Sequence, residues 1–371
     1  MNPFVFGVIA SGTRYCPRPD LETTLQERLL SGQNVYLLGP RRVGKTSLVE
    51  RVASQHFKKR HIRIDFMTVK TSEEAIEWVL NAWLQYERSN KTISSALKFI
   101  ASLNLDVSFL GNRIKVESGD RLKRLSLDDV FNRIDKKPKR SQPPLLLFFD
   151  EFQTLLDIDK KHRFDFLGKL RKGIQHLAHV RVVYAGSVRH ALHEIFQNAD
   201  SPFYNAAEPI EIEAFEPRER FHKFLGSKFL EGERAPANGF WSKTDSITLG
   251  NPSDTQRLCG AVWETSKPGE HLTEKNIEKA LSRIFEHEQR MNGSIIEHST
   301  AIQKKCLVGI AIHGGASPTS GAFLEAIRHK NGAGVTKALS HYVKSGVLLK
   351  NGPAYHFTNP FFREWLIRTT P

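Results

Sequence analysis

The segment Gly39 to Thr46 reads G-P-R-R-V-G-K-T and matches the phosphate-loop pattern G-x4-G-K-[S/T]. It follows the apolar run Val35–Leu38 and precedes Ser47–Ala53, a stretch compatible with a helix. A nucleoside triphosphate site requires this order of strand, glycine-rich turn and helix, because successive backbone N–H groups and the helix N-terminus must point at one cluster of phosphate oxygens. The segment therefore predicts a nucleotide site.

Each residue type in this loop has a physical role. Gly39 and Gly44 allow backbone conformations that a side chain would forbid, and they let the loop approach phosphate closely. Lys45 places a positive charge at the β and γ oxygens, and Thr46 offers a hydroxyl ligand to Mg²⁺. The expected cofactor contacts are all the residues of the loop and the one that follows: Gly39, Pro40, Arg41, Arg42, Val43, Gly44, Lys45, Thr46 and Ser47.

Length and composition predict a soluble protein of two or three domains, because 371 residues exceed one ordinary core. No apolar run reaches the roughly 18 residues that a membrane helix needs, and Met1–Ala10 lacks the features of a signal peptide. The three cysteines, Cys16, Cys259 and Cys306, lie far apart and outside any metal-binding spacing. We therefore expect a reduced, cytoplasmic setting with no membrane partner.

The formal net charge of +14 is distributed unevenly along the chain. Residues 301–371 hold nine Lys and Arg against two Glu, a net charge of +7. Half of the excess is therefore concentrated in the last fifth of the chain. An excess of this size suits a polyanionic partner better than a neutral one.

Two further segments read as buried parallel strands. Leu145–Phe149 is a run of apolar residues followed by Asp150 and Glu151, as in a strand buried on both faces with carboxylates at its C-terminal end. Val180–Tyr184 is the next such run, and Ser187 follows it. Strands that alternate with helices imply a parallel sheet in which ligands bind beyond the strand C-termini. The side chains expected to converge there are Thr46, Asp150, Glu151 and Ser187.

Changes of pattern divide the chain into three predicted domains. The alternation from Leu103 to Glu117, with a turn at Gly111-Asn112, predicts a β-hairpin inserted in the α/β core. Glu216-Pro217 opens a helical region, and Met291–Ser294 reads as a linker. The predicted domains are a P-loop core over 1–215 with the hairpin near 103–117, a helical domain over 216–293 and a third domain over 294–371.

The third domain is predicted to contain three helices and a hairpin, the order of a winged helix. The helices are expected over Ile302–Ala311, about Ser320–His329 and Val335–Ser345, and the strands over Val347–Leu349 and Tyr355–Phe357.

Basic residues of this domain are placed as in a DNA-binding module. Lys337 and Lys344 fall on one side of the third helix, while Leu339 and Val343 can face inward. Lys350 stands beside the turn of the hairpin. This placement predicts contacts with the phosphates of double-stranded DNA. The same charges would also keep a protein-docking module soluble, so a protein partner remains the alternative.

Together these motifs resemble the archaeal-type ATPases of the AAA+/STAND group, which are related to origin-recognition ATPases. The motifs are G-P-R-R-V-G-K-T, the strand end F-F-D-E-F-Q, the later A-G-S, the triplet Gly250-Asn251-Pro252 and the terminal N-P-F-F-R-E-W-L. The resemblance implies a P-loop NTPase parallel sheet of AAA+ type with a helical lid and a C-terminal winged-helix domain. It further implies an ATP-hydrolysing, Mg²⁺-dependent switch that can form a homo-oligomer or bind a protein partner.

The resemblance also implies roles for single residues. Asp150 resembles the carboxylate that holds Mg²⁺ together with Thr46, and Glu151 resembles the base that polarises the attacking water. Ser187 resembles the polar residue that senses the γ-phosphate. The expected catalytic residues are therefore Lys45, Glu151 and Ser187.

Adenine is the expected base. Pro252 matches the G-x-P element that packs near the base in such proteins, and Arg18 in C-P-R-P-D resembles the arginine of their N-terminal G-R-E motif. A GTPase usually carries N-K-x-D to recognise guanine. The near match at residues 90–93 has Ile93 where the carboxylate must stand.

Overall fold

The computed structural model describes residues 1–58, 60–90, 94, 98, 107–110, 113–116, 127–136, 138–158 and 163–369. The chain forms two compact units. The α/β unit comprises Val8–Glu213, and the helical unit comprises Met1–Gly7 together with Ala214–Pro371.

A parallel sheet of five strands forms the centre of the α/β unit. Its spatial order is β2 (His61–Asp65), β5 (Leu145–Asp150), β6 (Val180–Ala185), β1 (Val35–Leu38) and β7 (Glu208–Glu211). The strands predicted from the apolar runs are confirmed. Because neighbouring strands are parallel, their C-terminal ends meet at one edge of the sheet, where Asp65 stands in register with Asp150.

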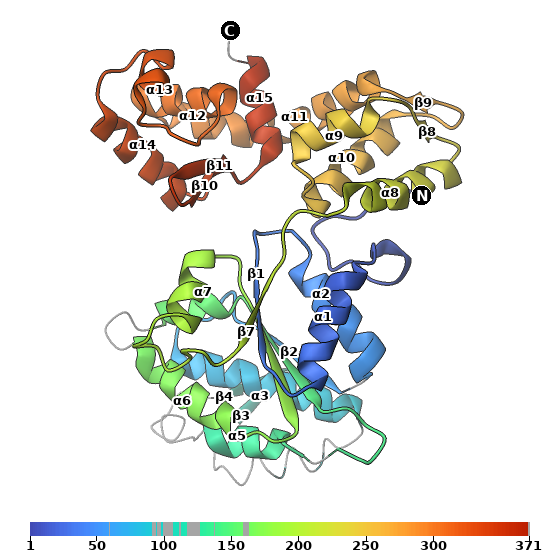
Figure 1. The fold of residues 1–371 in the computed structure, drawn as a ribbon, viewed down its shortest axis with the longest axis vertical. Helices are drawn as coiled ribbons and strands as arrows, with labels where there is room; N and C mark the ends of the chain where they lie inside the picture. The colour runs from blue at the N-terminus through green and yellow to red at the C-terminus, as the bar shows by residue number, and fades with distance from the viewer. Residues whose placement is uncertain are drawn as a thin grey trace. The chain divides into compact units, whose positions relative to one another are not determined.

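Helices cover both faces of this sheet (Figure 1). On one face lie α1 (Pro19–Leu30) and α2 (Lys45–Val52), and on the other α3 (Ser72–Ser89), α5 (Leu127–Ile134), α6 (Arg163–Gln175) and α7 (Arg189–Phe196). Successive strand residues point to opposite faces, so Val35 and Leu37 of β1 pack with α1 and α2, while Tyr36 and Leu38 enter the other core. This burial on both faces explains why the strands are continuous apolar runs.

Shorter elements join these layers. The unit also contains the 3-10 helices η1 (Gly12–Arg14) and η4 (Phe152–Asp157) and the π-helix η2 (Ala53–Phe57). The predicted insertion is confirmed as an antiparallel pair, β3 (Val107–Leu110) and β4 (Arg113–Val116), with Val107 opposite Val116. Its predicted turn at 111–112 and its ends at 103–106 and 117 lie outside the described residues.

The helical unit begins with α8 (Arg218–Glu231), α9 (Phe240–Thr248), α10 (Pro252–Thr265) and α11 (Glu274–Glu297), and with the parallel pair β8 (Ala235–Pro236) and β9 (His271–Leu272). The linker predicted at Met291–Ser294 is wrong, because α11 runs through it without a break. The Asn292-Gly293 pair is typical of a turn, but Asn292 is fully buried within the helix. Tertiary packing therefore decides the conformation here, rather than the local preference of the two residues. None of the helices among the described residues combines the length and the apolar character needed to cross a membrane.

The last part of the helical unit has the predicted order of elements. It contains α12 (Ala301–His313), α13 (Gly321–Ala326), α14 (Gly332–Lys344), the antiparallel pair β10 (Leu348–Asn351) and β11 (Ala354–Phe357), and α15 (Pro360–Thr369). These elements share one core, in which Leu307, Leu339 and Phe362 are buried. Leu339 is inward as predicted and Val343 packs against this core, while the second helix is shorter than predicted.

Candidate nucleotide-binding site

The phosphate loop connects β1 to α2 at the C-terminal edge of the sheet. Arg42 and Gly44 both have left-handed backbone conformations, with φ of 67° and 94°, and α2 begins at the next residue, Lys45. Val43 is buried in the core beneath α1 and α2, whereas Arg41 and Arg42 are exposed. The packing of Val43 in this core holds the loop backbone beside the start of α2.

The close packing around the loop requires a glycine at position 39. The loop runs beside the chain that leaves β7, where the amide of Ile212 donates to the carbonyl of Leu38 at 2.7 Å. A Cβ atom on Gly39 would overlap the carbonyl of Ile212. Only glycine therefore allows β1 and the end of β7 to lie this close together.

Lys45 is buried within the loop, with 7% of its surface exposed. Its Nζ donates to the carbonyl oxygens of Gly39 at 2.7 Å and of Pro40 at 2.8 Å. Burial lowers the pKa of this ammonium to about 8, although the carboxylates of Glu151 and Asp150 act to raise it. A buried cation of this kind gains from an anionic ligand, which supplies a counter-charge without water.

Thr46 and Asp150 meet as predicted. Thr46 Oγ1 donates to Asp150 Oδ2 at 2.9 Å, and the carboxyl group of Asp150 is buried. Burial raises the pKa of Asp150, while Arg63 and the Thr46 hydroxyl act to lower it. A hydroxyl and a carboxylate oxygen at one point form a donor set suited to Mg²⁺.

The sequence did not reveal the role of Arg63. This β2 residue donates to Asp150 Oδ2 from Nη2 at 2.8 Å and from Nε at 3.2 Å, and it also contacts Asp65. The alternation of β2 was a usable signal, since Ile62 and Ile64 are buried and Arg63 points the other way. Placing Arg63 beside Asp150 further requires knowing that β2 and β5 are neighbours.

Glu151 is held by two hydrogen bonds. Its Oε2 accepts from Ser187 Oγ at 2.9 Å and from Gln153 Nε2 at 2.5 Å. Ser187 Oγ in turn accepts from Arg41 Nε at 3.2 Å, so the ends of β5 and β6 are linked to the phosphate loop. Gln153 belongs to the D-E-F-Q motif, but no pattern in the sequence singles it out.

The backbone of Glu151 is left-handed, with a φ of 51°. For a residue with a side chain this conformation costs about 1 kcal/mol or more. Glu151 is the single residue between the end of β5 and the start of η4. Its left-handed backbone turns the chain at this point, directly after Asp150.

Arg18 and Pro252 belong to two different units of the chain. Arg18 is buried just before α1, where its amide donates to Glu22 Oε1 at 2.7 Å and its Nη2 to the carbonyl of Glu213 at 3.3 Å. Pro252 is the first residue of α10 in the helical unit, and Asn251 caps that helix.

The predicted DNA-contacting lysines are all exposed. Lys337 and Lys344 lie two turns apart on α14, and Lys350 lies on β10 with its Nζ 5.7 Å from the centre of the Tyr355 ring.

Comparisons with known proteins support this fold. A Walker-type ATPase of Pyrococcus abyssi superposes with a TM-score of 0.61 at 17% identity, over 98% of this chain and 99% of that chain. The ORC2 protein of Aeropyrum pernix, solved in ADPNP and ADP complexes, gives a TM-score of 0.52 at 12% identity, over 99% and 96%. No protein-family model and no curated protein matches the chain. The chain thus has the P-loop NTPase α/β fold of these archaeal proteins, as the sequence predicted.

We predict that Gly39→Ala destabilises the α/β unit by about 1–3 kcal/mol, the usual cost of forcing an extra methyl group into a packed site. Gly168→Ala is the matched control, because a Cβ atom there would meet only Pro202 Cγ at 3.8 Å. It should stabilise the same unit by about 0.5–1 kcal/mol, since alanine favours a helix interior. Urea unfolding followed by hydrogen exchange in β5 measures both, and equal stabilities would refute the packing argument.

Proposed function

We propose that this protein binds ATP with Mg²⁺ at the phosphate loop and hydrolyses it, acting as a molecular switch. One observation carries the proposal. Lys45 and Thr46 at the phosphate loop gather with Asp150 and the oriented Glu151 at the end of β5, at the C-terminal edge of one parallel sheet. Phosphoryl transfer depends mostly on positioning and charge neutralisation, which these groups can supply.

The residues divide the chemistry among them. The loop amides and Lys45 hold the β- and γ-phosphates, and Thr46 and Asp150 hold Mg²⁺. When bound, the metal neutralises charge on the phosphate oxygens. Glu151 accepts a proton from the attacking water, and Ser187 contacts the γ-phosphate while it orients Glu151.

We assign adenine as the base. The chain lacks the carboxylate of N-K-x-D, and the structurally similar ORC2 protein was solved with ADPNP and ADP. In this proposal Pro252 of the helical lid packs near the base, and Arg18 contributes to the nucleotide site from the start of α1.

The C-terminal elements act, in this proposal, as a winged-helix domain over 294–371 that binds double-stranded DNA. Three helices, a hairpin and exposed basic residues on α14 and β10 support it. The lid then covers 216–293, and α11 crosses the boundary as one continuous helix. A protein partner, or a second copy of the chain, is the alternative occupant of the same basic surface.

We place the protein in the cytoplasm. None of its three cysteines forms a disulfide bond, and all three are buried. Burial raises the pKa of Cys306 to about 11 and that of Cys259 as well. Thiols of this kind are unreactive and belong to a reducing compartment.

Glu151→Gln should retain ATP binding and lose turnover by about a hundredfold or more, the usual contribution of a general base. The amide can still accept a hydrogen bond from Ser187, but it cannot take a proton. Steady-state ATPase assays measure the effect, with Glu208→Gln on the exposed part of β7 as the control. A Glu151→Gln protein as active as the wild type would remove Glu151 from the mechanism.

Arg63→Ala should lower the Mg²⁺ concentration that gives half-maximal nucleotide binding by several-fold. The guanidinium lies 2.8 Å from the Asp150 oxygen that also accepts from Thr46, so it competes with a cation for that oxygen. Arg28→Ala removes the same charge from α1, where Arg28 donates to the carbonyl of Pro209, and should have no effect. An unchanged or higher Mg²⁺ requirement in Arg63→Ala would contradict the assignment.

Replacing Lys337 and Lys344 together by Ala should reduce the slope of log affinity for duplex DNA against log salt by about 1.8. Each phosphate contact contributes about 0.9 to that slope. Lys223→Ala with Lys243→Ala, on α8 and α9, removes the same charge elsewhere in the helical unit. If the two double variants give the same slope, the basic face of α14 does not contact DNA.

A further inference from the structure

A cavity of about 750 Å³ lies in the α/β unit at the opposite edge of the sheet from the phosphate loop. Its lining includes Arg60, just before β2, and Leu145, the first residue of β5. Asp150 ends β5 five residues further on, about 16 Å away along the strand. The cavity is therefore separate from the nucleotide site, and its size is that of a ligand pocket.

The floor of this cavity is apolar and aromatic. Phe57 and Leu145 are buried in it, and Tyr86 of α3 forms a half-buried wall. Burial raises the pKa of the Tyr86 hydroxyl, while the charge of Arg60 acts to lower it. Arg60 and Tyr86 both line the cavity.

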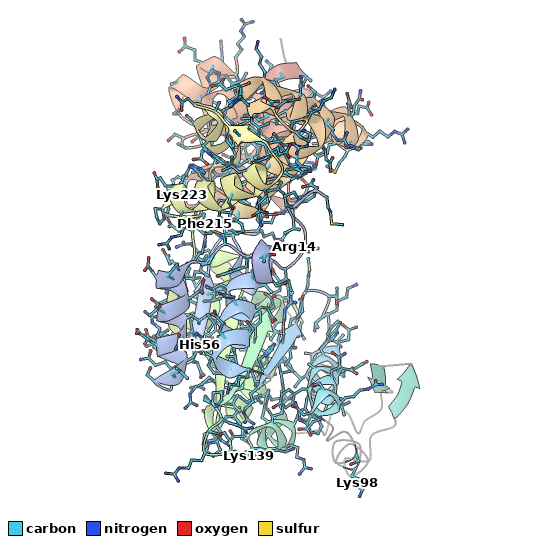
Figure 2. All side chains as sticks on the ribbon, turned by 90° about the vertical axis from the view of Figure 1, so that its right-hand side faces the viewer. Arg14, His56, Lys98, Lys139, Phe215 and Lys223 are labelled. Carbon is cyan, nitrogen blue, oxygen red and sulfur yellow. The ribbon has the colours of Figure 1, made fainter. Side chains whose placement is uncertain are left out.

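The rim of the cavity is basic. Lys58, Arg60, Lys136 and Lys139 are four cations on the lining, against the single carboxylate of Glu87. Figure 2 shows Lys139 at the lower end of the α/β unit, and both Lys139 and Lys58 are exposed. The rim therefore keeps an excess of positive charge although Lys136 Nζ lies 3.1 Å from Glu87 Oε1.

Two basic sequence runs meet at this rim because of the sheet topology. Lys58-Lys59-Arg60 precedes β2, and the run from Lys136 to Arg140 precedes β5. Lys59 and Lys137 lie outside the described residues. The strands are parallel neighbours, with His61 opposite Leu146, and Arg60 Nε donates to the carbonyl of Pro143 at 2.9 Å. Segments far apart in the sequence thus form one charged surface.

We propose that this cavity binds single-stranded nucleic acid. Phosphates would contact the rim lysines, and one unpaired base would enter the cavity and stack on Tyr86. A charged surface that extends beyond the cavity suits a polyanion, and an aromatic wall beside cations is typical of single-strand sites. The carboxylates of an acidic peptide could pair with the cations of the rim, but they would make no stacking contact with Tyr86.

The test uses the full chain and a fluorescent oligothymidylate of twelve nucleotides, with anisotropy measured over a range of salt. All proteins also carry Lys337→Ala and Lys344→Ala, so the result does not depend on the proposed winged-helix contact. Adding Lys58→Ala and Lys139→Ala should reduce the salt slope by about 1.4, since each single-strand phosphate contributes about 0.7. Tyr86→Leu should weaken binding about tenfold and leave the slope unchanged, because it removes only stacking.

Lys169→Ala with Lys172→Ala on α6 is the control for charge, and thermal unfolding midpoints confirm that each variant folds. A salt slope unaffected by Lys58→Ala and Lys139→Ala would overturn the proposal. So would a polyglutamate peptide or an anionic phosphatidylserine vesicle that competes as well as the oligonucleotide while Tyr86→Leu has no effect. Competition by polyglutamate would assign the cavity to an acidic protein, and competition by the vesicle would assign it to a membrane surface.

Discussion

The buried carboxylate of Asp150 is the constraint on which the site depends. A carboxylate removed from water is stable only when cations or donors surround it. Here the donors are Thr46 from the phosphate loop and Arg63 from the neighbouring strand. Three segments must therefore be in register before this group can be buried, and the same register gathers the residues that we assign to ATP and Mg²⁺.

The two faces of the sheet explain how that register is maintained. Helices on both faces bury strands that are apolar on both sides, and the packing of β1 against β7 leaves no room for a side chain at Gly39. The groups that we assign to ATP and Mg²⁺ lie at or beyond the C-terminal ends of strands. One edge holds the phosphate loop with its carboxylates, and the other holds the basic cavity, with β5 extending from one to the other.

Much of this arrangement could be predicted from the sequence. The phosphate loop, the apolar strands and the convergence of Thr46 with Asp150 and of Glu151 with Ser187 follow from local pattern and from the geometry of parallel sheets. Arg63 could not be placed, because its role depends on which strand lies beside β5. The linker at 291–294 was predicted wrongly, because the burial of Asn292 is a tertiary property that a turn-forming dipeptide does not report.

The most direct test of the central claim is binding of labelled ATP to the purified full chain in the presence of Mg²⁺. We expect saturable binding that unlabelled ATP displaces and GTP does not. Lys45→Ala should abolish binding, because no other cation is buried in the loop among the residues that the structure describes. Wild-type affinity in Lys45→Ala, or equal displacement by GTP, would contradict the assignment of this site to ATP.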